Sequence, residues 1–447
     1  MKEQYKKESP VLSLLGMGGG GTGTALGGLA LPKTYVDDVY STALYEGNAS
    51  SNTVPSGLDF SEGSWLSWIK IRDGSDSHFL SDSTQKTGVC FDSLASDRTY
   101  GKQVGETTGI NSVGTSSYSI QGSNAQVNGN TKKYISWNFK ATPGFFDVVT
   151  WTGNATNRVI SHNLGSVPGM ILVKRTDTIE NWHVYHRSTG ATKYLTLDTN
   201  NAEATGSSIW NDTTPTSTNF TVGTNGAVNG SGGTYVAYIF AHDDASFGTD
   251  GDESIIKCGS YTGAYTPINI DLGFEPQWVL IKQATGSSNT YSNWGIFDNM
   301  RGIHTGSNNP PLAPNLSHAE GDDPPGTSEF LEITPTGFIV DPGVERNAMV
   351  NINAAASYIY MAIRRPNKPP EAGTDVFQSL TYPGNSADTT RSTNILVDFL
   401  FTHRTNGGTP YVIDRVRGTD RYLNTSSTSV EDTQPTAFKE FGNDYIK

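Results

Sequence analysis

Two histidines and a tryptophan in one short segment are the first residues in this sequence that could bind a metal ion or a sugar. The segment runs from Trp182 through His183 to His186, and histidine is a common metal ligand. Its aromatic and β-branched composition predicts a strand, on which residues three apart point to opposite faces. One zinc ion could not easily bind both histidines, so the pattern favours a structural aromatic strand.

Acidic residues gather in one loop-like stretch, at Asp243, Asp244, Asp250, Asp252 and Glu253. Calcium binds about six to eight oxygen atoms, often supplied by such loops. The residue spacing of an EF-hand loop is not met here. A solvated acidic linker is therefore the favoured interpretation, with calcium binding as the alternative.

Catalytic chemistry has little support in the sequence. A glycoside hydrolase needs two carboxyl groups either about 5 Å or about 6.5 to 9.5 Å apart. The pairs that could be nominated are Glu329 with Glu332 and Asp341 with Glu345, but neither recurs or belongs to a specific motif. Nucleophile elbows, phosphate-binding loops and the zinc motif HExxH are absent from the sequence. The sequence therefore predicts neither an enzyme nor a cofactor.

Charge and cysteine content exclude further classes of protein. The net charge is −13, and no basic stripe is present that could bind the phosphates of a nucleic acid. The two cysteines, Cys90 and Cys258, lie far apart and form neither a disulfide framework nor a zinc motif, so two buried thiols are expected. No segment is long and apolar enough to insert into a membrane as a helix.

Trp210 is the strongest candidate for a sugar contact, because an aromatic ring exposed on a loop can stack on a sugar. It is followed by Asn211-Asp212, in a segment without strand character. Trp137 and Trp278 lie in apolar strands and are expected in the core. The insert at 305–326 is rich in Pro and Asn, which predicts a long surface loop that could carry a ligand site.

These residues belong to a unit that recurs along the chain. The glycine of one turn stands at positions 47, 153, 263 and 384, with steps of 106 (153 − 47), 110 (263 − 153) and 121 (384 − 263) residues. Two other markers keep nearly the same spacing, a lysine after an apolar pair and a closing strand that begins with tyrosine. They stand at Lys70, Lys174 and Lys282, and at Tyr134, Tyr235 and Tyr358. The agreement of three markers predicts a tandem array.

The closing strand indicates the fold class. From Tyr235 to Phe240 every residue is apolar or aromatic, which predicts a strand covered on both faces. Charged residues make up 17% of the chain, below the roughly 25% of ordinary soluble domains, and Gly, Ser, Thr and Asn crowd the segments between apolar runs. We therefore expect an all-β protein built of tandem β-sandwich domains, jelly-roll or lectin-like, in series.

The markers divide the chain into five parts. They are an N-terminal docking peptide at 1–34, β-sandwich repeats at 35–142, 143–253 and 254–370, and an incomplete fourth repeat at 371–447. Each repeat has the size of an ordinary domain and is expected to bury a core of its own, as a bead in a series. The fourth lacks the closing strand, which predicts completion by another chain or by sequence beyond this one.

The first 34 residues combine a glycine-rich stretch with a short apolar segment. Ordering glycine is costly in conformational entropy, so a neighbouring subunit is expected to hold this part of the chain. The residues predicted to dock it to a larger particle are Val11, Leu12, Leu14, Leu15 and Met17. A flexible tail is the alternative.

Four segments of the repeats, at 143–154, 161–175, 220–229 and 271–278, resemble virion proteins of marine bacteriophages. Residues 9–19 resemble the start of those proteins, and the likeness covers about residues 35 to 440. In that group, tail-fibre or tail-associated proteins carry tandem copies of such a module. The resemblance implies a structural role in the phage tail, with the amino end docked on the particle and the modules projecting.

The expected function is that of a bacteriophage virion protein, a tail fibre or tail-associated protein that takes part in host attachment. Its expected partners are other tail or virion proteins through the N-terminus, further copies of itself in a homo-oligomer such as a trimer, and a glycan of the host surface. The alternative is a carbohydrate-binding adhesin of viral or bacterial origin, with its ligand held by loops such as 305–326.

Overall fold

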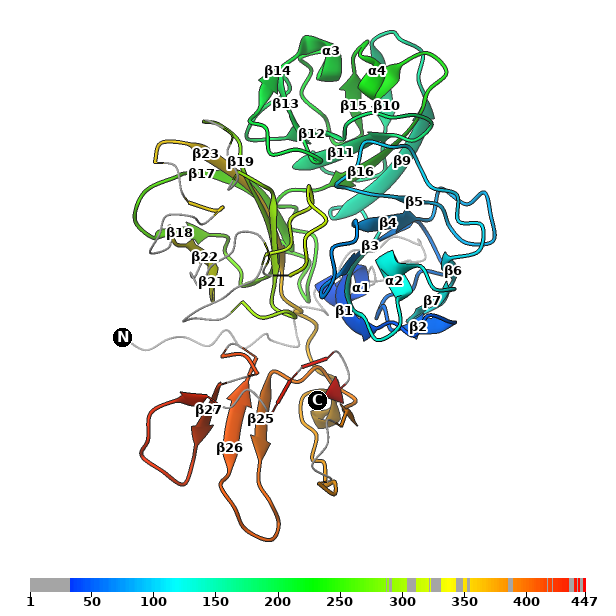
Figure 1. Ribbon diagram of the computed structural model, residues 1–447. Coiled ribbons are helices and arrows are strands. Elements are labelled where there is room, and N and C mark those ends of the chain that lie inside the picture. Colours follow the sequence, from blue (N-terminus) through cyan, green and yellow to red (C-terminus); the bar gives the residue numbers. More distant parts are fainter. Residues whose placement is uncertain are drawn as a thin grey trace, which may run out of the picture. The chain divides into compact units, whose positions relative to one another are not determined.

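The computed structural model describes residues 33–447 except 287, 289–291, 304–310, 321, 323–330, 343–348, 352–353, 385–388, 416, 420, 434–437, 440 and 443–444. Its elements are antiparallel strands and a few single helical turns, shown in Figure 1. The prediction of an all-β fold of sandwich type is confirmed. No helix among these residues has the length and apolarity needed to cross a membrane.

The first unit, residues 35–142, contains two sheets and two helical turns. The larger sheet has the order β1 (Tyr40–Glu46), β8 (Lys133–Lys140), β3 (Trp65–Ile71), β4 (Phe79–Asp82) and β5 (Ser93–Leu94). The smaller sheet has the order β2 (Asn52–Val54), β7 (Tyr118–Gln121) and β6 (Gly109–Val113). The helical turns are α1 (Val36–Val39) and α2 (Ala125–Asn128).

The second unit, residues 143–253, repeats this plan. Its larger sheet has the order β14 (Ala204–Thr205), β13 (Lys193–Thr196), β12 (His183–His186), β11 (Met170–Arg175), β16 (Thr234–Phe240) and β9 (Phe146–Thr152). Its smaller sheet pairs β10 (Arg158–Ser161) with β15 (Asn219–Val222). The helical turns are α3 (Ser207–Trp210) and α4 (Gly226–Asn229).

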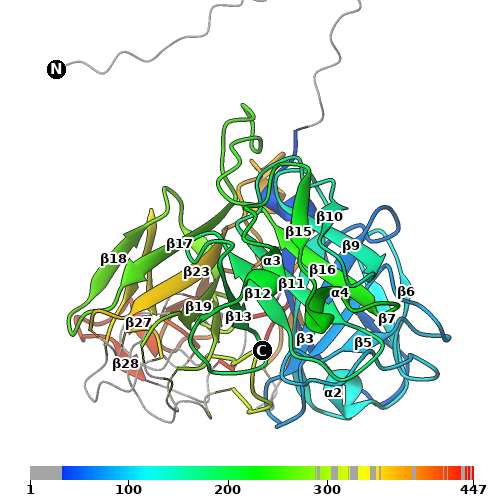
Figure 2. The same ribbon diagram turned by 90° about the horizontal axis from the view of Figure 1, so that it is seen from above.

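The described residues of the third unit, 254–370, form a four-stranded and a three-stranded sheet. The order in the first is β17 (Ile256–Thr262), β23 (Ser357–Arg364), β19 (Pro276–Gln283) and β20 (Gly295–Asp298), and Figure 2 shows β23 between its two neighbours. The order in the second is β18 (Ile268–Asp271), β22 (Gly337–Val340) and β21 (Leu331–Thr334).

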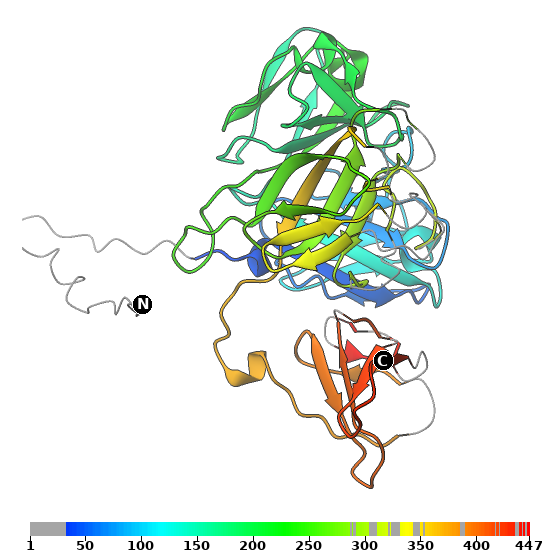
Figure 3. The ribbon, with the colours of Figure 1, turned by 90° about the vertical axis from the view of Figure 1, so that its left-hand side faces the viewer.

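The C-terminal unit, residues 371–447, is smaller. Its main sheet has the order β25 (Phe399–Thr402), β26 (Tyr411–Asp414), β27 (Arg421–Asn424) and β28 (Asp432–Thr433), and Figure 3 gives another view of its strands. A second pair joins β24 (Arg391–Ser392) and β29 (Tyr445–Ile446), and the short 3₁₀ turn η2 spans Gly373–Asp375. Its buried cluster is small, formed by Val397, Ile413, Phe441 and Ile446.

The closing strands β8, β16 and β23 are buried along almost their whole length. The apolar side chains of β8 and β23 divide between two different clusters, as the pleat of a strand allows, whereas those of β16 all lie in one cluster. In β23, Tyr358 faces a cluster that lies within the third unit, whereas Ile359 faces a cluster that draws on all three units. The prediction of a strand covered on both faces is confirmed.

One hydrophobic cluster joins the first three units. It includes Trp68 and Trp137 of the first, Tyr238 of the second, and Trp278 and Met361 of the third. The first and third units do bury clusters of their own, but the shared cluster shows that the three units are not independent beads in a series. The physical reason is that a sheet apolar on both faces needs cover on both, and here the second cover comes from neighbouring units.

Three lysines at equivalent positions connect these units. Each is fully buried near the end of a central strand, and each donates to a backbone carbonyl of a neighbouring unit. The donor–acceptor pairs are Lys70 Nζ to Ser317 O at 3.1 Å, Lys174 Nζ to Thr99 O at 2.7 Å, and Lys282 Nζ to Asn200 O at 3.2 Å. The first unit reaches the third, the second reaches the first and the third reaches the second, so the contacts close a ring.

A second set of contacts follows the same cyclic order. In each unit a ring N–H near the start of the next strand donates to a carbonyl of a neighbouring unit. The pairs are His78 Nε2 to Ala313 O at 3.0 Å, Trp182 Nε1 to Ala95 O at 2.9 Å, and Trp294 Nε1 to Thr196 O at 2.9 Å. Because Trp68 Nε1 donates to His78 Nδ1 at 2.9 Å, the proton of the neutral His78 ring lies on Nε2.

The polar turn that marks each unit is also built alike three times. Buried Asn229 accepts from the backbone N–H of Asn154 at 3.1 Å, and its Nδ2 donates to the carbonyl of Gly223 at 3.0 Å. Asn128 and Asn351 make the equivalent bonds, accepting from the N–H groups of Asn48 and Ala264 and donating to the carbonyls of Gly122 and Val340. Beside each turn two rings stack, with centroid distances of 5.1 Å for Tyr45–Tyr134, 5.3 Å for Trp151–Tyr235 and 5.1 Å for Tyr261–Tyr358.

Candidate functional site

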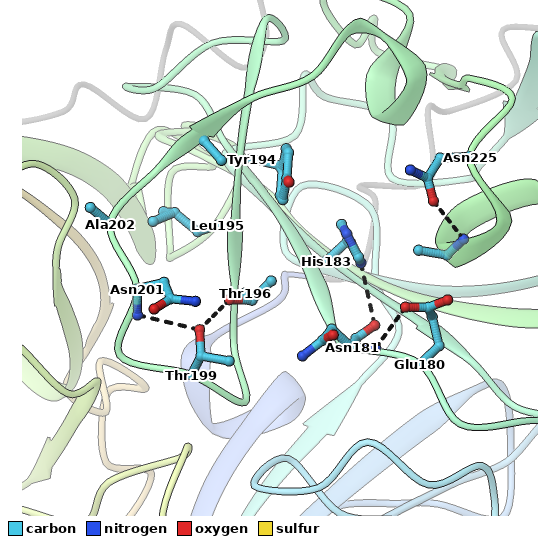
Figure 4. Close-up of a pocket in the computed structure, with 12 residues that line it drawn as sticks. Glu180, Asn181, His183, Tyr194, Leu195, Thr196, Thr199, Asn201, Ala202 and Asn225 are labelled. Atoms are coloured by element: carbon cyan, nitrogen blue, oxygen red, sulfur yellow. Dashed lines mark hydrogen bonds between the residues drawn. The ribbon is translucent and has the colours of Figure 1, made fainter. Parts of the chain in front are cut away.

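A polar pocket of about 310 Å³ lies in the second unit (Figure 4). Strands β12 and β13, the turn that follows β13, and the segment before α4 supply its walls. Twelve residues line it: Glu180, Asn181, His183, Tyr194, Leu195, Thr196, Thr199, Asn201, Ala202, Ala204, Asn225 and Ala227. Most of these carry polar side chains, so the pocket offers hydrogen bonds rather than apolar surface.

His183 forms a nearly buried part of the wall, with 7% of its surface exposed. Burial lowers the pKa of His183, so the ring is neutral at pH 7. Its Nδ1 lies 3.3 Å from the carbonyl of Asn181, which can only accept a hydrogen bond. The proton therefore sits on Nδ1, and Nε2 is an acceptor.

Glu180 and Asn181 are fixed beside this histidine. Glu180 Oε1 accepts from the backbone N–H of Asn181 at 3.1 Å, and Asn181 Nδ2 donates to Asp198 Oδ2 at 2.7 Å. Asp198 also accepts from the backbone N–H of Trp182 at 3.0 Å, and burial raises its pKa. Asp198, which does not itself line the pocket, thus fixes the position of the lining residue Asn181.

Several polar groups of the lining are not used within the protein. Among the described residues, no hydrogen-bond partner is present for His183 Nε2, the Tyr194 hydroxyl, the Asn201 carboxamide or Asn225 Nδ2. The Tyr194 ring lies beside His183 at a centroid distance of 5.1 Å. The pocket therefore presents donors, acceptors and a half-buried aromatic ring together.

The pocket residues do not recur in the other units. In strand register, His183 pairs with Val173 as Phe79 pairs with Ile69 and Gly295 with Ile281. The same register places Tyr194 where the first unit has Ser93. The contacts between units recur three times with different residues at these positions, so His183 and Tyr194 are not required for that packing.

The two histidines singled out in the sequence point in different directions. His183 lines the pocket, whereas His186 is fully buried and its Nε2 lies 3.1 Å from the carbonyl of Tyr360 in the third unit. The structure does not bring them together, as the geometry of a strand predicts. Sequence reasoning considered His183 as a metal or sugar ligand but favoured a structural role for it. It missed Glu180, Tyr194 and Asn201, because no motif links a turn to the strand beside it.

The expectation that Trp210 is exposed for a sugar contact is wrong. The segment folds into the single turn α3, and the Trp210 ring is 2% exposed. It packs edge to face on Tyr185 at a centroid distance of 6.1 Å. A large aromatic ring next to an apolar core is more stable inside it, even where the flanking residues are polar.

The insert at 305–326 is not simply a surface loop. Its described part includes Leu312, which lies in the cluster shared by three units, and the carbonyls of Ala313 and Ser317, which bind His78 and Lys70. Pro314 accepts a further bond from Ser96 Oγ at 2.7 Å. These contacts assign this part of the insert to the joint between the first and third units.

The other predicted residues are placed as follows. Asp243 pairs with Lys257 at 3.3 Å and Glu253 with Arg364 at 2.7 Å, and the residues described contain no group of three or more His, Cys, Asp or Glu suited to a metal ion. Cys90 and Cys258 are buried and unpaired with each other. Glu329 and Glu345 lie outside the described residues, as do the docking residues Val11, Leu12, Leu14, Leu15 and Met17.

One protein family matches the part of the chain that forms the three connected units. The family model described as a domain of unknown function, DUF7483, matches residues 36–366. The match begins at α1 and ends just after β23, so it takes the three units as one domain. A search of curated proteins found no match. The chain therefore belongs to the DUF7483 family.

Proposed function

We propose that this chain is a structural protein of a bacteriophage virion, a tail fibre or tail-associated protein. In this proposal the N-terminal residues 1–34 dock on the particle and the units project from it to take part in host attachment. The resemblance of four segments to virion proteins of marine bacteriophages is the reason for naming this class. The family match gives no function and leaves the proposal to be tested.

The observation that carries the proposal is the way the three units are joined. Polar side chains form hydrogen bonds between the units. Tyr238 of the second unit donates to Asp82 of the first at 2.8 Å, and Trp137 Nε1 of the first donates to Asp298 of the third at 3.2 Å. Asp298 also binds Arg301 at 2.7 Å, with both side chains almost completely buried. Such joints resist relative motion of the units, which is what a part that holds position on a particle needs.

We also propose self-association through the C-terminal unit. Its edge strand β25 exposes Phe399 (62%) and Phe401 (56%), and Phe377 (73%) is exposed in the same unit. Large exposed apolar side chains on a sheet edge favour pairing with another chain. A homo-oligomer such as a trimer is the state to test, by sedimentation of the full chain and of Phe399→Asp with Phe401→Asp.

The proposal is tested on purified particles. Mass spectrometry and antibody labelling should find the chain on the tail, at one defined site. A deletion of residues 2–31 should leave a folded, soluble protein that is absent from particles. Normal incorporation of this deletion would refute docking through the N-terminus, and absence of the full chain from particles would refute the virion role.

A second candidate function is a carbohydrate-binding adhesin. The observation that favours it is the polar pocket of the second unit, with an aromatic ring and unused hydrogen-bonding groups. The described part of the 305–326 insert does not support it, because that part joins two units.

A further inference from the structure

The pocket of the second unit holds polar groups that neither the sandwich nor the contacts between units use. The structure assigns acceptors to it at His183 Nε2 and the Glu180 carboxylate, and a donor at Asn225 Nδ2. Tyr194 and Asn201 add groups that both donate and accept. The His183 ring is nearly buried as a whole, but its Nε2 is not one of the fully buried atoms without a partner, so this acceptor is accessible to a ligand.

We infer that this pocket binds one pyranose ring of a saccharide. Sugar hydroxyls both donate and accept, so they match a wall that mixes carboxylate, imidazole, carboxamide and phenol groups. The Tyr194 ring can cover an apolar face of the sugar, as aromatic rings do with apolar groups. The volume of about 310 Å³ is at the lower end of the about 300–1,000 Å³ of small-molecule sites, which suits one sugar ring.

Other ligand classes fit the pocket less well. A phosphate or carboxylate would face Glu180, and the nearby cation Lys193 is already paired with Glu203. Lys174 Nζ donates to the backbone carbonyls of Thr99 and Glu180 and is therefore not directed at a ligand in the pocket. An apolar ligand would leave the polar groups of the wall without partners, at a cost for each.

The position of the pocket also indicates a ligand site. Register places Phe79 and Gly295 where this unit has His183, so two of three copies of the same fold form without the imidazole. The turn that lines the pocket is held from outside, since the backbone N–H of Glu203 donates to the carbonyl of Ala284 in the third unit at 2.7 Å. The wall is therefore preformed by contacts that do not involve the ligand.

This inference deepens the attachment role proposed above. It rests on that role only for the source of the saccharide, which would be the host surface. The test is saturation-transfer difference NMR of the full chain with glucose, galactose, mannose, N-acetylglucosamine and N-acetylgalactosamine, followed by titration. At least one of these sugars should bind saturably. Glu180→Gln and His183→Phe should each weaken binding at least tenfold.

The variants are chosen to keep the fold. His183→Phe introduces the residue of the first unit, and Tyr194→Phe removes one oxygen atom and should weaken binding about threefold or more. His403→Phe is the matched control, because His403 is exposed and outside the pocket, and it should bind as the parent does. Thermal unfolding of each variant shows whether it is folded. If Glu180→Gln or His183→Phe does not fold, the binding measured for Tyr194→Phe decides the outcome.

Two results would overturn the inference: no saturable binding of any sugar in this panel, or equal binding by the parent and all three pocket variants. Neither result bears on the virion role, since the assay needs no particle. Conversely, absence of the chain from particles would leave the measured sugar affinity unchanged. The two failures are therefore distinguishable.

Discussion

The buried lysines show how single residues connect the units. Lys282 is fully buried, and its ammonium group donates to the carbonyls of Asn200, Gln283 and Ser292 at 3.2, 2.7 and 2.8 Å. Burial lowers the pKa of Lys282 to about 7, and that of Lys70 and Lys174 to about 8. Three hydrogen bonds satisfy the three protons but do not fully replace water around the charge.

These pKa values predict how stability depends on pH. The unfolded chain binds a proton on each lysine up to a pKa of about 10.4, whereas the folded protein gives it up near pH 7 to 8. Between those values the unfolded state binds more protons, so the free energy of unfolding should rise with pH. Denaturant unfolding between pH 6.5 and 10 measures this slope.

Lys282→Met should flatten the slope by the contribution of one proton, which is up to about 1.4 kcal/mol per pH unit. Lys132→Met is the matched control, because Lys132 is exposed, and it should leave the slope unchanged. A slope in Lys282→Met equal to that of the parent would contradict the assignment of the proton to this lysine.

Asn229 gives a second prediction at the residue scale. Its side chain is fully buried and satisfies the N–H of Asn154 and the carbonyl of Gly223. Asn229→Ala leaves these backbone groups without partners and should lower the free energy of unfolding by roughly 2 to 4 kcal/mol, about 1 to 3 for each unsatisfied group. Asn130→Ala, at an exposed position, should change it by less than about 0.5 kcal/mol.

At the scale of elements, two of the marker glycines, Gly47 and Gly153, owe their place to close backbone approach, whereas a Cβ at Gly384 would meet nothing within 4 Å. A Cβ added to Gly153 would stand 2.2 Å from the carbonyl oxygen of Gly230, and one added to Gly47 would stand 2.2 Å from that of Gly129. No L-residue fits there unless the turn moves away from the closing strand. This explains in physical terms why the sequence marker is a glycine.

Gly153→Ala should therefore shift the turn against β16 and lower the midpoint of thermal unfolding by several degrees, equivalent to about 2 kcal/mol or more. Gly226→Ala, in the same unit, is the control, since its added Cβ would meet only Arg175 Nη1, at 3.9 Å. Equal unfolding midpoints for the two variants would contradict the prediction, because the turn would then accommodate the added Cβ without loss of stability.

The strands were the part of the fold most open to prediction from sequence. The run from Tyr235 to Phe240 is apolar on both faces, and this identified a covered strand without any knowledge of its neighbours. Trp210 was misplaced because local polarity does not reveal which short turn folds back onto a core. The pocket was not predicted, because the sequence favoured a structural role for His183, and Glu180, Tyr194 and Asn201 are ordinary surface residue types.

At the scale of the molecule, the shared cluster predicts joint folding of the three units. A fragment of residues 35–370 should unfold in one cooperative transition by calorimetry, because separating any unit exposes apolar residues such as Trp68, Tyr238 and Trp278 to water. The fragment 143–253 alone should be unfolded or aggregated. Three separate transitions in 35–370, or a stable monomer of 143–253, would contradict this expectation.

The closure of the ring was not predictable from one sequence. Contacts such as Arg72 with Glu320 join residues far apart in the chain, and spacing alone cannot tell a string from a closed arrangement. One signal was present, since Lys70, Lys174 and Lys282 each stand within an apolar strand, where an unpaired charge would be costly. In the sequence these lysines served only as markers of the repeat, and nothing in their spacing names the unit that each one contacts.

The cyclic order of the lysine contacts has a consequence for assembly. Three separate subunits with these interfaces would fall apart on dilution, whereas here each interface forms between segments tethered in one polypeptide. Tethering makes closure a first-order event whose equilibrium is independent of protein concentration. A single copy, at the scarcity of one molecule per cell, would be as completely assembled as a concentrated stock.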